Sequence, residues 1–105
     1  MMEVFTEKNF EKEVLKAKGL VVVDFGAPWC HPCRSLGPVF EKLAQANPDI
    51  KFGKVDIDDN GQLAVKYEVS SIPVVAVFRN GKIVERIAGI QRQAKYQEAI
   101  DKVAA

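Results

Sequence analysis

The sequence predicts an α/β fold in which a mixed sheet of about five strands lies between about four helices, giving three layers. Residues 20–26 are apolar at both parities except at Asp24, a pattern typical of a central strand covered by helices on both faces. A helical segment separates this strand from another over residues 51–57, which is the spacing of a βαβ unit with a right-handed crossover. Asn80-Gly81 lies between two apolar runs and predicts a β-hairpin.

The chain before the central strand predicts a short strand and a helix. Residues 4–5 are apolar and can begin the sheet. Thr6 is a residue type that caps helices, and apolar residues at helical spacing follow it. We therefore expect a helix over residues 7–18, ended by Gly19.

Three further helices are predicted after the central strand. The apolar residues that follow Trp29 recur at helical spacing, Pro38 is expected to kink this helix, and Asn47-Pro48 should end it. Turn residues at 58–61 precede a short helix. The last helix carries one apolar face, made by Tyr96, Ala99, Ile100 and Val103.

Length and charge limit the classes of function. At 105 residues the chain has the length of one domain, residues 1–105. A formal charge of +1 argues against a nucleic-acid binder, which needs a strong basic surplus. No apolar run reaches the ~18–20 residues of a membrane span, and the first residues do not form a secretory signal. We expect a cytoplasmic monomer that binds neither nucleic acid nor a membrane.

The two cysteines, Cys30 and Cys33, ask for a chemical explanation because one bridge across so short a loop would stabilise the fold little. If they lie in the first turn of a helix, their Cα atoms are about 5 Å apart, a separation that permits both a disulfide and an open dithiol. A buried inert pair is one alternative and a metal site another. A structural zinc needs four ligands, however, and the chain has two Cys and one His, so we expect no metal.

The predicted junction between strand and helix should also tune the thiols. Free amide groups and the positive end of the helix dipole stabilise a thiolate at Cys30. Pro32 suits a first helical turn and stiffens the dipeptide between the sulfurs. His31, the only histidine, can add positive charge beside Cys30 or can be an exposed, passive residue.

Two ionisable residues lie within the predicted central strands. Asp24 and Lys54 are each surrounded by apolar neighbours in sequence, where a charge is costly unless it is paired. A buried acid has a raised pKa, which suits proton transfer near neutral pH. The plainer alternatives are a tolerated core carboxylate at Asp24 and a solvent-facing lysine at Lys54.

The segment over residues 22–34, which contains Trp-Cys-His-Pro-Cys, resembles the active-site segment of the thioredoxin family. The resemblance extends over nearly the whole chain, through Pro38, residues 54–58, Ile72-Pro73, residues 78–81 and Gly89. It implies the thioredoxin fold and a thiol–disulfide oxidoreductase that reduces protein disulfides. No bound cofactor is then needed, because the dithiol itself carries the electrons.

The resemblance assigns roles to the site residues. Cys30 matches the cysteine that attacks a target disulfide, and Cys33 matches the one that resolves the mixed disulfide. Asp24 matches the buried acid that moves the proton of the resolving cysteine, and Lys54 matches its charge partner. Electrons are expected to come from an NADPH-linked flavin enzyme, thioredoxin reductase, and to go to disulfide-containing proteins.

The resemblance also implies a binding surface around Cys30. Ile72-Pro73 matches a loop with a cis proline, whose backbone pairs with an extended segment of the target. The expected flat apolar patch is formed by Trp29, Ile72, Pro73, Val74, Gly89 and Ile90.

The chain departs from the family pattern at two positions of the motif. Thioredoxins usually carry glycine at the position of His31 and commonly tryptophan at the position of Gly26. Histidine between the cysteines is a habit of the more oxidising relatives, where it occupies the other position of the dipeptide. We predict that His31 makes this protein more oxidising than a standard thioredoxin, because it favours the thiolate of the reduced form. The alternatives to a reductase are therefore a disulfide oxidase or isomerase and, from another class, a non-catalytic binding module.

Overall fold

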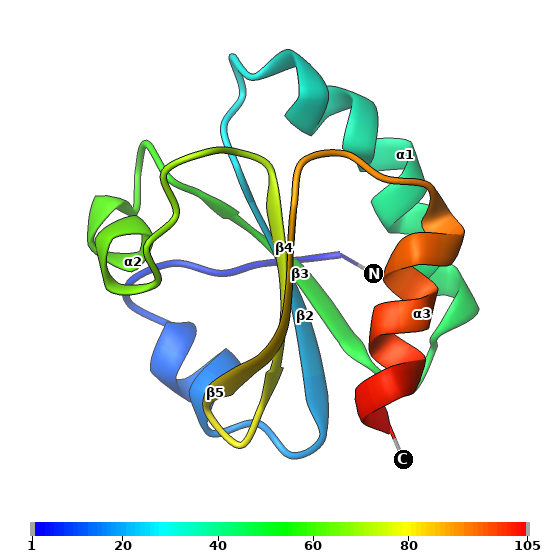
Figure 1. The fold of residues 1–105 in the computed structure, drawn as a ribbon. Helices are drawn as coiled ribbons and strands as arrows, with labels where there is room; N and C mark the ends of the chain where they lie inside the picture. The colour runs from blue at the N-terminus through cyan, green and yellow to red at the C-terminus, as the bar shows by residue number, and fades with distance from the viewer. Residues whose placement is uncertain (1, 105) are drawn as a thin grey trace.

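A five-stranded mixed sheet forms the centre of the computed structural model, which describes residues 2–104 (Figure 1). The strands lie in the order β1-β3-β2-β4-β5. Strand β3 pairs parallel with β1 and β2, while β4 pairs antiparallel with β2 and β5. Their bounds are β1 Glu3–Val4, β2 Leu20–Gly26, β3 Lys51–Asp56, β4 Val74–Arg79 and β5 Lys82–Ala88.

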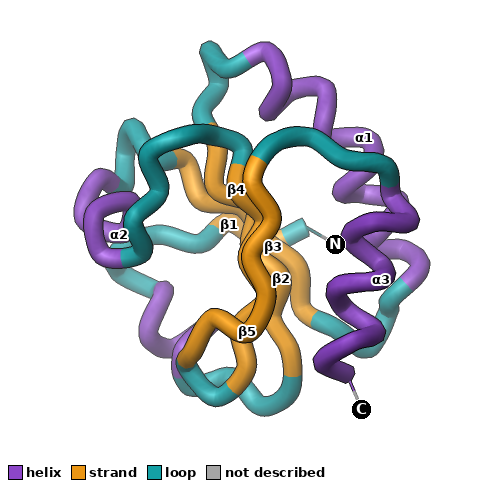
Figure 2. Tube along the Cα trace, viewed as in Figure 1, coloured by secondary structure: helices purple, strands orange, loops and turns teal. Residues whose placement is uncertain are grey.

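Four helical segments cover the two faces of this sheet. Figures 1 and 2 show α1 and α3 on one face, with α2 and the short helical segment η1 on the other. Their bounds are η1 Glu11–Leu15, α1 His31–Ala46, α2 Gly61–Lys66 and α3 Gln93–Ala104. The predicted three-layer architecture and the thioredoxin fold are confirmed.

Strand β2 divides the core into two halves because its side chains alternate between the two faces of the sheet. Val21, Val23 and Phe25 pack in the cluster beneath η1 and α2. Leu20 and Val22 pack in the other cluster, with α1 and α3. Asp24 has the parity of this second set and therefore lies on the face that α1 covers.

The predicted helix over residues 7–18 is shorter in the structure, where a five-residue π-helical segment, η1, follows turns at residues 7–9. The N-cap of η1 is Phe10 and not Thr6, whose hydroxyl instead accepts the Asn9 amide at 3.3 Å within the preceding turn. The Asn9 side chain, however, bonds back to Val4 O and to the Thr6 amide. Such local bonds compete with the regular helix and favour a turn there.

The other predicted boundaries agree with the structure to within a residue or two. Helix α1 ends at Ala46, with Asn47 as its C-cap and Pro38 inside it. Strand β3 ends at Asp56, one residue earlier than expected. The hairpin turn has positive φ at Asn80 and Gly81, which matches the type I′ preference of this dipeptide.

Candidate redox-active site

The cysteine pair lies at the start of α1, after the loop that follows β2. Cys30 is the N-cap of α1, with extended backbone (φ −85°, ψ 113°), and Cys33 is in the first turn. A disulfide joins them, and their Cα atoms are 5.2 Å apart, as the helical-turn geometry predicted. Both cysteines thus lie at the N-terminal end of α1, shortly after β2 ends at Gly26.

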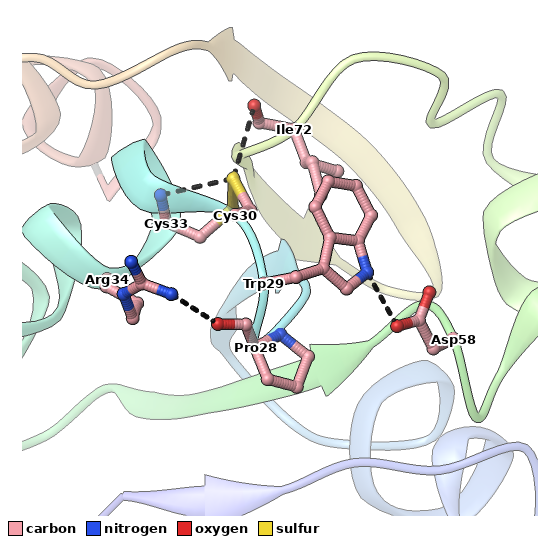
Figure 3. The surroundings of a disulfide bond; sticks show 7 residues. All are labelled: Pro28, Trp29, Cys30, Cys33, Arg34, Asp58 and Ile72. Carbon is pink, nitrogen blue, oxygen red and sulfur yellow. Dashed lines mark hydrogen bonds between the residues drawn. A yellow bond between two sulfur atoms is a disulfide. The ribbon is translucent and has the colours of Figure 1, made fainter.

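The sulfur of Cys30 has polar partners on two sides (Figure 3). It accepts a hydrogen bond from the Cys33 amide at 3.3 Å, and it lies 3.9 Å from the carbonyl oxygen of Ile72. His31 and Pro32 are the first two residues of α1, and the His31 side chain is exposed. An amide donor at a helix N-terminus stabilises negative charge, so this environment favours a thiolate at Cys30 once the disulfide opens.

The carboxyl group of Asp24 is buried near Cys33, beside Gly26. It is 5 % exposed, and its Oδ1 atom has no hydrogen-bond partner within the described residues. Burial raises the pKa of Asp24 from 3.8 to about 6, and the positive charge of Lys54 opposes this rise. Lys54 is the Cα partner of Asp24 across β2 and β3, although no ion pair within 4 Å joins them in residues 2–104.

Gly26 lies beside both Cys33 and Asp24. A Cβ atom added at Gly26 would lie 3.2 Å from Cys33 Sγ and 3.8 Å from Asp24 Oδ1. The sulfur and the oxygen are therefore no farther apart than these two distances together, a span that one or two hydrogen-bonded waters can bridge. The space beside Gly26 belongs to a pocket of about 390 Å³, lined by Asp24, Gly26, Ala27, Pro28, Cys33, Arg34, Gly37, Lys54, Val55 and Asp56.

The predicted binding surface is only partly an exposed apolar patch. Trp29 is 66 % exposed and Ile90 42 % exposed, and Ile72 and Gly89 keep partial exposure. Val74, in contrast, is 2 % exposed and belongs to the core beneath α2, because its side chain points to that face of the sheet. Its side chain is therefore not part of the surface, and the prediction that included it was wrong.

Pro73 is also buried, so its ring adds little exposed area to the predicted surface. The Ile72–Pro73 peptide bond is cis, as the resemblance implied. The Pro73 carbonyl accepts the Gly89 amide at 2.8 Å, which joins the two loops next to the disulfide.

Three side chains at the site, those of Trp29, Arg34 and Tyr96, make hydrogen bonds that were not predicted from the sequence. The Trp29 indole N–H donates to Asp58 Oδ2 at 2.7 Å, although Asp58 reads in sequence as a solvated turn residue. Arg34 donates to the carbonyl oxygen of Pro28 at 2.9 Å (Figure 3). The hydroxyl group of Tyr96 accepts the Gln91 amide and donates to Gly89 O. Tyr96 lies on the predicted apolar face of α3, a position that carries no signal for its hydroxyl partners.

Residues 2–104 include no helix long and apolar enough to cross a bilayer. The same range holds no group of three or more His, Cys, Asp and Glu side chains arranged to bind a metal ion.

The family model described as Thioredoxin matches residues 1–102. The chain belongs to the thioredoxin family. It is 41 % identical over 102 residues to a thioredoxin of Chlamydia pneumoniae, which covers 97 % of this chain and 98 % of the relative. It is 40 % identical over 98 residues to a thioredoxin of Bacillus subtilis, with 92 % of each chain covered.

A mitochondrial thioredoxin of Mus musculus is 40 % identical over 96 residues, which are 90 % of this chain and 58 % of the relative. Relatives thus come from bacteria and from an organelle. Like other thioredoxins, this chain is a thiol–disulfide oxidoreductase, a protein-disulfide reductase, and its Cys-X-X-Cys redox pair is Cys30 and Cys33.

Proposed function

We propose that the protein reduces target disulfides in two exchange steps, with Cys30 attacking and Cys33 resolving. The Cys30 thiolate attacks one target sulfur, forms a mixed disulfide and expels the other target sulfur as a thiolate. Cys33 then loses its proton and attacks Cys30 Sγ, which re-forms the Cys30–Cys33 disulfide and releases the second target thiolate. Two electrons pass to the target, and its two thiolates take up protons.

The N-cap position of Cys30 is the observation that carries this order of steps. The Cys33 amide donates to Cys30 Sγ at 3.3 Å, and no corresponding backbone donor to Cys33 Sγ is present in residues 2–104. Since an amide donor and the helix dipole favour the charged sulfur, Cys30 holds a thiolate more readily than Cys33 does. The attacking role therefore falls to Cys30.

Asp24 is assigned the role of accepting the proton that Cys33 loses. Lys54 is assigned as the charge partner of Asp24. A carboxyl group with a pKa of about 6 can accept and return a proton near neutral pH. The position of Asp24 and Cys33 on either side of the space at Gly26 supports transfer through bound water. The positive charge of Lys54, on the neighbouring strand, lowers the pKa of Asp24 and so limits how far burial raises it.

The target is proposed to lie across the loops at Trp29, Ile72 and Gly89-Ile90. The exposed side chains of Trp29 and Ile90 supply apolar contact area in these loops. The backbone of Ile72, next to Cys30 Sγ, is positioned to pair with an extended target segment. The cis peptide bond to Pro73 sets the course of this backbone.

Thioredoxins generally pair with thioredoxin reductase and reduce target proteins. We accordingly assign an NADPH-linked flavin enzyme of that type as the electron donor and disulfide-containing proteins as the acceptors. A monomer of one domain in a cytoplasmic compartment suits this cycle, because a reductant must be kept reduced to act.

A trap with single-cysteine variants tests the order of steps. Cys33→Ser should accumulate a stable mixed disulfide with insulin, whose own disulfides are intact at the start, because the resolving thiol is gone. Cys30→Ser should accumulate little, and wild type should accelerate the reduction of insulin by dithiothreitol. Mass spectrometry of the trapped adduct locates the bond, and a Cys33-linked adduct with insulin in place of a Cys30-linked one would reverse the roles.

The variant motif itself, with His31 between the cysteines, favours a more oxidising protein. His31 begins α1 beside Cys30, where a positive charge stabilises the reduced thiolate and so raises the reduction potential. His31→Gly should therefore shift the redox equilibrium against glutathione toward the disulfide, with more protein oxidised at a given buffer ratio. An equilibrium that stays put, or that shifts toward the dithiol, contradicts this role.

A further inference from the structure

The loop between β5 and α3 carries part of the proposed target surface but belongs to neither element. Residues 89–91 follow the end of β5 at Ala88 and precede α3, which begins at Gln93. Ile90 is 42 % exposed in this loop. A surface loop without regular backbone pairing opens easily unless other bonds hold it. The bonds that hold this loop therefore decide how well it presents Ile90 to a target.

The hydroxyl group of Tyr96 bonds to both ends of this loop. It accepts the Gln91 amide at 2.9 Å and donates to the Gly89 carbonyl oxygen at 3.1 Å. The Tyr96 side chain is 1 % exposed and packs in the core cluster with α1, so the hydroxyl group is held from a close-packed base. One side chain of α3 thus ties the loop at residue 89 and at residue 91.

A short series of contacts connects this loop to the attacking sulfur. The Gly89 amide donates to the Pro73 carbonyl oxygen at 2.8 Å, and Figure 1 shows the β5–α3 loop next to the loop that leads into β4. The carbonyl oxygen of Ile72, the residue before Pro73, lies 3.9 Å from Cys30 Sγ. Gly89 is therefore bonded through its amide to the loop beside the sulfur and through its carbonyl group to Tyr96.

We propose that Tyr96 is a positioning residue for protein targets, because its hydroxyl group holds residues 89–91 in the conformation that an extended target segment binds. A loop that is already ordered costs a partner less entropy on binding, so this tie lowers the target concentration that the protein needs. The hydroxyl group bonds to Gln91 and Gly89 and takes no part in the exchange between sulfurs.

The same tie should make the protein select protein disulfides over small ones. A small disulfide has no extended segment to lie across residues 89–91, so it gains nothing from an ordered loop. The inference rests on the proposed function, because it requires the target to lie across this loop. It adds a residue of α3 that sets the affinity for the target without touching it.

Tyr96→Phe tests the role directly, since it removes the hydroxyl group and keeps the ring. Reduced protein is mixed with insulin over a range of concentrations, and mass spectrometry of acid-quenched samples follows the oxidation of the protein. The same measurement with hydroxyethyl disulfide reports on the sulfurs alone. Tyr67→Phe is the matched control, because the Tyr67 ring packs on the opposite face of the sheet, against the core cluster beneath η1 and α2. Circular dichroism checks that each variant is folded.

We expect Tyr96→Phe to raise the insulin concentration that gives half of the maximal rate about three- to tenfold, the range for the loss of one or two hydrogen bonds. The maximal rate, the rate with hydroxyethyl disulfide and the redox equilibrium against glutathione should stay within about twofold of wild type, because neither sulfur loses a contact. Tyr67→Phe should leave all of these quantities within the same range.

A substitution on the loop itself separates this inference from the proposed function. Ile90→Ser removes the apolar contact that the loop offers, and it should also raise the half-saturating insulin concentration. Since Tyr96 acts through the loop, the effect of Ile90→Ser should be smaller in the Tyr96→Phe background than in wild type. If Ile90→Ser changes nothing, the target does not lie across the loop, and the proposed target surface fails together with this inference.

Two other results overturn the role of Tyr96 alone. One is an unchanged half-saturating insulin concentration in Tyr96→Phe while Ile90→Ser raises it. The other is an equal slowing of the reactions with insulin and with hydroxyethyl disulfide, because the effect would then lie at the sulfurs and not at the loop.

Discussion

Replacing Asp24 with asparagine should make the stability of the oxidised protein less dependent on pH. The carboxyl group is 5 % exposed, and burial raises its pKa from 3.8 to about 6. The folded state therefore holds the Asp24 proton more tightly than the unfolded state. This contribution to stability is complete below the unfolded pKa and is lost as the pH rises through the folded pKa.

The size of the effect follows from the shift in pKa. A difference of about two pKa units, from 3.8 to about 6, corresponds to about 3 kcal/mol of the free energy of unfolding at ~1.4 kcal/mol per unit. Most of that loss, about 2–3 kcal/mol, falls between pH ~4 and pH ~8 in wild type. Asp24→Asn carries no titrating group, so the constant cost or gain of its buried amide cancels when the two pH values are compared.

Urea unfolding of wild type and Asp24→Asn, with the disulfide intact, measures this difference. The gap between the two free energies of unfolding should move in favour of the variant by about 2–3 kcal/mol from pH ~4 to pH ~8. Other ionisable groups titrate in both proteins and drop out. A gap that is the same at both pH values would refute the raised pKa, and a gap that moves the other way would show that Lys54 outweighs burial.

Three further predictions concern packing and the loop beside the site. Gly53→Ala should destabilise the fold by about 1–3 kcal/mol, because the added methyl group would overlap the ring of the fully buried Phe5. Gly37→Ala has open space and lies within α1, so urea unfolding should show a gain of about 0.5–1 kcal/mol, and equal effects of the two substitutions would contradict this reasoning. Tyr96→Phe removes a hydroxyl group that bonds the loop at residues 89–91, at a cost of about 1–2 kcal/mol; faster amide hydrogen exchange should appear at Gln91 first, and unchanged exchange there would rule the bond out as a restraint.

Local pattern was sufficient to predict most of the fold. The doubly apolar run at residues 20–26 indicated a central strand, and the structure buries all but its last residue. The Asn80-Gly81 dipeptide indicated the hairpin because few other residues accept positive φ at both positions. The helix over residues 7–18 was overestimated, since the competing bonds of Asn9 depend on where Val4 and Thr6 lie.

The candidate site divides in the same way. The separation of the two cysteines in space follows from their sequence separation of three residues at a helix start, which is a local property. Strand pairing sets Asp24 opposite Lys54 and buries Val74. Loop packing brings Trp29 to Asp58. No single segment contains that information.

By itself, the sequence predicted the redox pair, because two cysteines at a strand-to-helix junction can form a reversible disulfide with a stabilised thiolate, and the resemblance of residues 22–34 to the thioredoxin family supplied the activity. Only the tertiary structure decided how the two sulfurs differ. The Ile72 carbonyl oxygen lies 3.9 Å from Cys30 Sγ, whereas Cys33 lines a pocket with Gly26 and the buried Asp24. The physical reason is that exposure and burial are set by atoms far apart along the chain, and these come together only when β2, β3 and α1 pack.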